Sequence, residues 1–205
     1  QGTVTNANNT NYDITFTNGT LTIGRKTLTA TTSASNKVYD GTTTATATLT
    51  LSGLVGAETL GQSVGATFAD KNVANAKTVT VNSITLSDGD SGGLASNYSI
   101  STGQTTTANI TAKALTIAGI TASNKTYNGN TTATIDASAA TFTGLVDGDD
   151  VTVSATGTFD NKNVGTNKTV TLTETNAGDD VGNYSITDQG STTANITAKA
   201  LTATA

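Results

Sequence analysis

Apolar and polar residues alternate along much of this chain with a period of two. The alternation is clear in residues 45–51 (Ala-Thr-Ala-Thr-Leu-Thr-Leu), 151–153 and 170–173. Such a pattern places one face of a strand on a core and the other in water. Dipeptides typical of tight turns separate these segments, at Asn18-Gly19, Asp40-Gly41, Asp88-Gly89, Asn128-Gly129 and Asp147-Gly148. The pattern therefore predicts roughly seven to eight short strands per unit and almost no helix.

The chain also repeats itself, about 86 to 88 residues apart. Residues 35–41 (Ser-Asn-Lys-Val-Tyr-Asp-Gly) return as residues 123–129 (Ser-Asn-Lys-Thr-Tyr-Asn-Gly), and residues 107–116 return as residues 193–202. An internal period sets the size of the structural unit. We expect two complete units, which are residues 26–112 and 113–198. The flanks would be the C-terminal strands of a preceding repeat (1–25) and the first strand of a following one (199–205).

The boundary between the two units contains no spacer. Residues 105–112 run into residues 113–117 without a stretch of Gly, Pro or Ser. A last strand that continues directly into the next unit's first strand leaves little hinge freedom. We therefore expect an all-β protein of tandem antiparallel β-sandwich (Ig-like) repeats, joined end to end as a stiff rod.

Composition narrows the function classes. The formal net charge is −5, and the sequence contains no basic stripe, so we expect no nucleic-acid partner. No apolar run approaches the length of a membrane helix, and we expect no membrane insertion. The chain has no His and no Cys, which removes the common nucleophile–base pairs. We expect no enzyme and assign no catalytic residue.

Residues 36–43 (Asn-Lys-Val-Tyr-Asp-Gly-Thr-Thr) and 124–132 resemble the YDG repeat of large secreted bacterial adhesins of the filamentous haemagglutinin type. The Lys-Asn-Val segments at 71–73 and 162–164 fit the same family. Residues 11–23 are similar to the closing strands of the glycine-rich MBG-like repeats that often adjoin it. The resemblance implies tandem β-sandwich domains in a long extracellular fibre, secreted or held on the bacterial surface, with a role in adhesion and biofilm.

The repeated motif supplies a structural signature, which is Lys37, Tyr39 and Gly41 in the first unit and Lys125, Tyr127 and Gly129 in the second. We expect each Tyr ring to fill core volume while its hydroxyl ties down a loop. The carboxylate of Asp40 becomes the amide of Asn128, so the repeat keeps turn-forming ability and loses charge. A duplicated active site would keep its ionisable group, so the motif is expected to preserve shape.

Acidic turns are the candidates for a metal. Asp88 and Asp90 lie close together in one turn, and Asp147, Asp149 and Asp150 lie in another, which suits a hard cation such as Ca²⁺. Neither turn matches an EF-hand loop, and solvated turns are the favoured interpretation. We expect no cofactor, with Ca²⁺ left open, as is a Lys–Asn isopeptide bond between the matched lysines and the many Asn residues.

These observations favour a structural function. We expect stalk or spacer repeats of a large bacterial adhesin, presenting a distal adhesive domain. The expected partners are neighbouring repeats in the same chain, with a host-surface or matrix ligand bound through other domains. The alternative is a binding module that recognises host glycan or matrix, or that associates with itself in biofilm. The sequence assigns no binding residue to that alternative.

Overall fold

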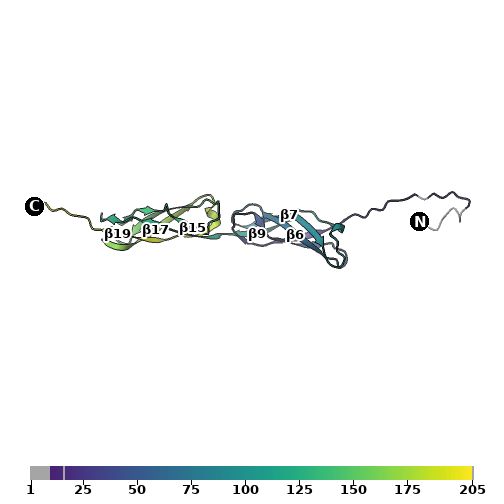
Figure 1. Ribbon diagram of the computed structural model, residues 1–205, viewed down its shortest axis with the longest axis horizontal. Helices are drawn as coiled ribbons and strands as arrows, with labels where there is room; N and C mark the ends of the chain where they lie inside the picture. Colours follow the sequence, from purple (N-terminus) through teal and green to yellow (C-terminus); the bar gives the residue numbers. More distant parts are fainter. Residues whose placement is uncertain (1–9, 16, 205) are drawn as a thin grey trace.

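The computed structural model describes residues 10–15 and 17–204. It confirms the predicted class, because the fold is all-β, with 52% of the described residues in strands. We call residues 26–112 repeat 1 and residues 113–198 repeat 2. Figure 1 shows the two repeats end to end as an elongated rod, with the flanking segments leaving at opposite ends. Within the described ranges, no helix is long and apolar enough to cross a membrane.

Repeat 1 is built around a five-stranded sheet with the order β3-β9-β7-β6-β4. A two-stranded sheet, β2-β5, and a parallel pair, β1-β8, accompany it. The elements are Lys26–Thr27 (β1), Thr29–Ala34 (β2), Lys37–Val38 (β3), Thr44–Ala45 (β4), Ala47–Ser52 (β5), Leu60–Phe68 (β6), Ala74–Asp88 (β7), the 3₁₀ turn Ala95–Asn97 (η2), Tyr98–Ser99 (β8) and Thr105–Thr111 (β9).

Repeat 2 reproduces this arrangement with the five-stranded order β12-β19-β17-β16-β13. A three-stranded sheet, β15-β10-β18, and the pair β11-β14 complete it. The elements are Lys113–Ala118 (β10), Thr121–Ala122 (β11), Lys125–Thr126 (β12), Thr132–Ala133 (β13), Ile135–Asp136 (β14), Thr141–Thr143 (β15), Thr152–Phe159 (β16), Gly165–Ala177 (β17), the 3₁₀ turn Val181–Asn183 (η3), Tyr184–Thr187 (β18) and Ser191–Thr197 (β19).

Two details of the sheets differ from the expectation. The described part of repeat 1 has nine strands and that of repeat 2 has ten, because bends divide longer extended segments into pieces as short as two residues. The ladders are also not purely antiparallel, since β1-β8 and β3-β9 pair in parallel, as do β10-β18 and β12-β19. The parallel pairs place a strand from the start of each repeat beside one from its end.

The repeated Asn residues hold equivalent irregularities in the two large sheets. The β7–β9 register shifts between Ala74 and Lys77, where Ala76 has a φ of 50°. The Ala76 N–H donates to Asn109 Oδ1 at 2.8 Å, and the Asn109 N–H donates to Asn36 Oδ1 at 2.7 Å. Repeat 2 has the same pair of bonds. The Asn167 N–H donates to Asn195 Oδ1, and the Asn195 N–H donates to Asn124 Oδ1. The motif therefore repeats because it fixes backbone geometry.

The hydrophobic core runs along the rod in two clusters. Both sheets of repeat 1 contribute to the first cluster, which contains Leu49 of β5 together with Phe68, Val79 and Val81 of the large sheet. This cluster continues beyond repeat 1, since it includes residues of repeat 2 at Leu115, Val151 and Tyr184. A second cluster lies within repeat 2 around Ile117, Phe159 and Val170. One apolar core thus crosses the boundary between the repeats.

Candidate functional site at the junction between the repeats

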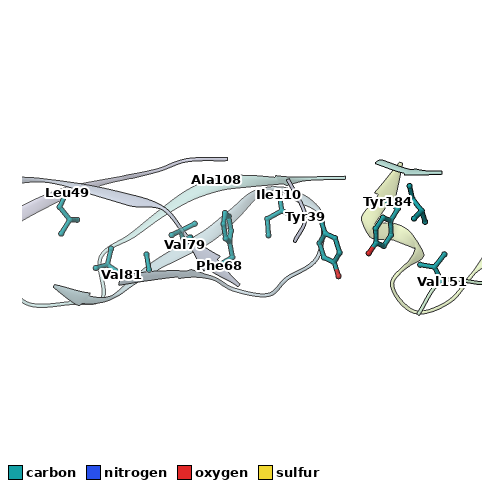
Figure 2. Close-up of a cluster of buried hydrophobic side chains, with 12 residues drawn as sticks. Tyr39, Leu49, Phe68, Val79, Val81, Ala108, Ile110, Val151 and Tyr184 are labelled. Atoms are coloured by element: carbon teal, nitrogen blue, oxygen red, sulfur yellow. The ribbon is translucent and has the colours of Figure 1, made fainter. Parts of the chain in front are cut away.

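The junction is formed by chain continuity and by loops from both repeats. Strand β9 ends at Thr111 and β10 begins at Lys113, so only Ala112 lies between them. Around this connection, repeat 1 presents the loop after β3 and the loop between β6 and β7. Repeat 2 presents the loop between β15 and β16 and the turn η3. Figure 2 shows Tyr39 of repeat 1 and Tyr184 of repeat 2 facing each other across the boundary.

Local structure positions Tyr39 at the end of repeat 1. Its backbone N–H donates to Thr111 O at 2.9 Å, which extends the short parallel pairing of β3 with β9. Gly41 then turns the chain with a φ of 77°, a conformation that favours glycine. The ring is 1% exposed and meets the Tyr184 ring edge to face, with centroids 5.6 Å apart. Tyr39 therefore lies at the end of repeat 1 and packs on repeat 2.

Asp149 is the centre of a hydrogen-bonded cluster that joins the two repeats. Tyr39 and Tyr184 donate their hydroxyls to Asp149 Oδ2, at 2.8 and 2.6 Å. Lys71 Nζ lies 3.1 Å from Asp149 Oδ1 and 2.8 Å from Asp180 Oδ1. The Asp149 side chain is only 3% exposed, so these donors replace the water that a carboxylate requires. We call Tyr39, Lys71, Asp149, Asp180 and Tyr184 the junction cluster.

The cluster holds a defined charge state. Burial disfavours the charged form of Asp149, but the hydrogen bonds from Tyr184, Tyr39 and Lys71 outweigh it and lower its pKa. Burial and the bond to Asp149 raise the pKa of Tyr184 to about 12 and also raise that of Tyr39. Hydrogen bonds to Asp180, Asp149 and Tyr39 raise the pKa of Lys71. Both tyrosines therefore stay neutral while the lysine and the aspartate stay charged.

These shifts predict how the junction responds to pH. The stability that Asp149 contributes is present above its unfolded pKa of about 3.9 and is lost as pH falls through the lower folded pKa. The contribution of Tyr184 is present below the unfolded pKa of about 10 and is lost as pH rises through the folded pKa of about 12. We therefore expect the thermal unfolding temperature, plotted against pH, to be constant between these two limits.

The Asp149→Asn variant isolates the part of the acid destabilisation that is due to Asp149. Other aspartates with lowered pKa values, such as Asp40, Asp70 and Asp160, also weaken the fold in acid, in both proteins. The difference in unfolding temperature between the wild type and Asp149→Asn should therefore shrink as pH falls below about 4. A difference that stays constant from neutral to acid pH would contradict the assignment.

Backbone and apolar contacts support the cluster. The Val73 N–H donates to Asn183 Oδ1 at 2.9 Å, and the Asn183 side chain is buried, at 4% exposure. The Val146 N–H donates to the Tyr184 hydroxyl at 2.9 Å, which holds that ring in place within repeat 2. Val73 and Val146 both pack against the shared core cluster. The junction therefore combines directional bonds with buried apolar surface.

The remaining signature residues serve their own repeats. Lys37 Nζ lies 2.7 Å from Asp40 Oδ1 and from the Thr42 carbonyl oxygen. Lys125 makes the equivalent bonds to the carbonyl and amide oxygens of Asn130, at 2.8 and 2.9 Å. The amide that replaces the Asp40 carboxylate as the acceptor for the lysine is therefore that of Asn130, two positions after Asn128. The turn keeps its lysine contact although the charge of Asp40 is lost.

Tyr127 and Gly129 occupy the free end of repeat 2. Tyr127 is half-buried against the second core cluster, and its hydroxyl makes no hydrogen bond within the described part of the chain. Gly129 has a φ of 84°, like Gly41, but no atom lies within 4 Å of an added Cβ there. The two copies of the motif therefore share local geometry and differ in whether another repeat covers them.

The acidic turns do not gather into a metal site. Asp88 accepts the Ala95 N–H at 2.8 Å, and the Asp90 N–H donates to Thr59 Oγ1 at 2.8 Å. Asp147 and Asp150 are exposed, whereas Asp149 is bound in the junction cluster. Across residues 10–15 and 17–204, no group of three acidic side chains is arranged to hold a metal ion.

Glycine at position 41 is required by the junction itself. A Cβ added there would lie 2.8 Å from Val146 Cγ1 of repeat 2. Both Gly41→Ala and Gly129→Ala impose the backbone cost of a positive φ, about 1 kcal/mol. Only Gly41→Ala should also push the repeats apart. We expect Gly41→Ala to lower the free energy of unfolding by about 1–2 kcal/mol more than Gly129→Ala, measured by urea denaturation. Equal losses would show that position 41 does not contact repeat 2.

Comparison with known proteins identifies both repeats. A family profile described as "YDG domain" matches residues 24–108 and again residues 111–194. A search of curated proteins and a search of solved structures each gave no match.

Proposed function

Since the chain belongs to the YDG domain family, we propose that its two repeats are stalk segments of a large secreted bacterial adhesin of the filamentous haemagglutinin type. In that role the repeats hold a distal adhesive domain away from the cell surface, in the extracellular space. The function is mechanical, and each repeat contributes length.

The observation that carries this proposal is the junction. A spacer transmits position only if its units keep a fixed orientation, and an ordinary linker between domains leaves them free to move. Here a single residue separates β9 from β10, the core continues across the boundary, and the buried carboxylate of Asp149 requires donors from both repeats. Separating the repeats would break the hydrogen bond from Tyr39 to Asp149, and both polar groups would then need water as a partner.

Stiffness can be measured directly, because the chain contains no cysteine. Spin labels attached at Thr85→Cys in β7 and Thr173→Cys in β17 would report the distance between the two repeats. Pulsed electron paramagnetic resonance measures the distribution of this distance between the labels. We expect one narrow distance distribution. A control chain with a short Gly-Ser insertion after Ala112 should give a broad one. A broad distribution in the chain without the insertion would refute the stalk function.

A second experiment separates the stalk from a binding module. The full chain would be tested on glycan arrays and on immobilised matrix proteins at high micromolar concentration. We expect no saturable binding, because the proposed role of these repeats is to present another domain. Saturable binding to one glycan or matrix protein, abolished by loop substitutions, would favour the binding module instead.

A further inference from the structure

The two outer ends of this molecule carry the two halves of the junction. Relative to the observed junction, the C-terminal end of repeat 2 repeats the residues contributed by repeat 1. Tyr127 corresponds to Tyr39, and residues 162–164 (Lys-Asn-Val) correspond to residues 71–73. We call Tyr127, Lys162, Asn163 and Val164 the C-terminal face.

The N-terminal end of repeat 1 carries the other half. Val55, Glu58, Asn97 and Tyr98 correspond to Val146, Asp149, Asn183 and Tyr184, and we call them the N-terminal face. Its internal bonds are already made. Tyr98 donates its hydroxyl to Glu58 Oε2 and accepts the Val55 N–H at 3.0 Å, as Tyr184 does with Asp149 and Val146.

Exposure shows what these faces lack. Val164 is 55% exposed and Val55 is 52% exposed, whereas their counterparts at the junction, Val73 and Val146, are half-buried. Asn97 is exposed, whereas Asn183 is 4% exposed. The charges are complementary, since one face offers the Lys162 ammonium and the other the Glu58 carboxylate. The outer faces therefore match the inner ones in chemistry and differ in being uncovered.

The flanking segments also carry apolar side chains that are exposed, although their counterparts in the repeats are buried. Leu201 is 93% exposed, but its counterparts Leu115 and Leu28 are buried, at 0% and 3%. On the other side, Ile23 is 90% exposed, while its counterpart Ile110 is 1% exposed. The segment after Ala198 thus has the apolar side chain of a repeat's first strand, with no core yet around it.

We propose that the C-terminal face docks the N-terminal face of a further YDG repeat joined through the segment that begins at Lys199, and that the N-terminal face of repeat 1 receives the C-terminal face of another such repeat. This inference rests on the proposed stalk function and names its partner. In the docked state, Tyr127 and Lys162 bind a buried carboxylate of the incoming repeat. The Val164 N–H donates to an Asn side chain that corresponds to Asn183.

The test extends the full chain by one repeat. A second copy of residues 113–198 is placed directly after Ala198, so that the new boundary has the same sequence context as the observed one. Hydrogen exchange of individual amides, followed by NMR, then reports docking. The Val73 amide should be protected in both chains. The Val164 amide should exchange freely in the 205-residue chain and slow by about tenfold or more in the extended one.

A matched variant tests the specific contact. Replacing Asn183 by Ala in the added copy removes the acceptor, so Val164 should lose its protection while Val73 keeps it. If Val164 exchanges equally fast with and without the added repeat, while Val73 stays protected, the docking inference is wrong and the stalk function stands. A freely exchanging Val73 would instead count against the stalk. Protection of Val164 in the 205-residue chain that disappears on dilution would assign the face to separate molecules and overturn docking within one chain.

Discussion

Replacing Tyr39 by alanine should destabilise the protein far more than the same change at Tyr127, although the two residues occupy the same place in the repeated motif. Tyr39 is 1% exposed, contacts the Tyr184 ring and bonds to Asp149 of repeat 2. Removing a fully buried aromatic side chain costs about 3–5 kcal/mol. Tyr127 is half-buried and is not covered by another repeat within the described residues, so we expect a loss of about 1–2 kcal/mol there.

Calorimetry would show where the loss falls. The shared core cluster couples the repeats, so we expect the unchanged chain to unfold in one transition. Tyr39→Ala should split this into two, with the first lowered by more than about 10 °C. Tyr127→Ala should lower the single transition without splitting it. If both variants lowered it by the same amount without a split, Tyr39 would stabilise only repeat 1.

Tyr39→Phe separates the ring from the hydroxyl. This variant keeps the apolar contact and removes one hydrogen bond to the charged Asp149, so we expect a loss of about 1.5–2 kcal/mol. Tyr127→Phe should be neutral, because the Tyr127 hydroxyl has no hydrogen-bond partner in the described part of the chain. The comparison shows how much of the junction depends on the directional bond and how much on packing.

The contrast between Tyr39 and Tyr127 also shows how far sequence reasoning reaches. Alternation predicted the strands, and the Asp-Gly and Asn-Gly dipeptides predicted the turns at Gly41 and Gly129, because both signals are local. Docking is not local. Tyr39 and Asp149 are 110 positions apart, and the two tyrosines have nearly the same neighbours in sequence. Within the described residues they differ in whether another repeat packs on them, and the local sequence pattern does not record that difference.

Asp149 illustrates the same limit from the other side. In the sequence it lies in an acidic turn with Asp147 and Asp150, which predicts a solvated loop or a weak calcium site. Its burial depends on Tyr39 and Lys71, two donors at the junction end of repeat 1. A signal was present, since Gly-Leu-Val at 53–55 and at 144–146 is followed in both repeats by an acidic residue, Glu58 or Asp149. A carboxylate kept at a matched position indicates a shared structural role, but it does not identify the partner.

Removing the carboxylate of Asp149 should therefore weaken the junction, although most changes in a surface turn are harmless. Asp149→Ala leaves two tyrosine hydroxyls without their acceptor and Lys71 with one carboxylate in place of two. Hydrogen bonds to a charged group contribute about 1.5–3 kcal/mol each, and part of this is recovered from water, so we expect a loss of about 3 kcal/mol. Asp149→Asn keeps an acceptor oxygen and should cost about half as much. The neighbouring Asp147 is exposed, and Asp147→Asn should change stability by less than about 0.5 kcal/mol.

A double-mutant cycle assigns the effect to the bond between the repeats. If Tyr39 and Asp149 interact directly, Tyr39→Phe and Asp149→Asn together should cost about 1 kcal/mol less than the sum of the two single changes. Tyr127→Phe with Asp149→Asn provides the control, because those residues lie at opposite ends of repeat 2 and their effects should add. Urea unfolding monitored by circular dichroism gives all the required free energies. Additivity in the Tyr39 cycle would show that the carboxylate stabilises repeat 2 alone, and the coupling between the repeats would then depend on the apolar contacts and the β9–β10 connection.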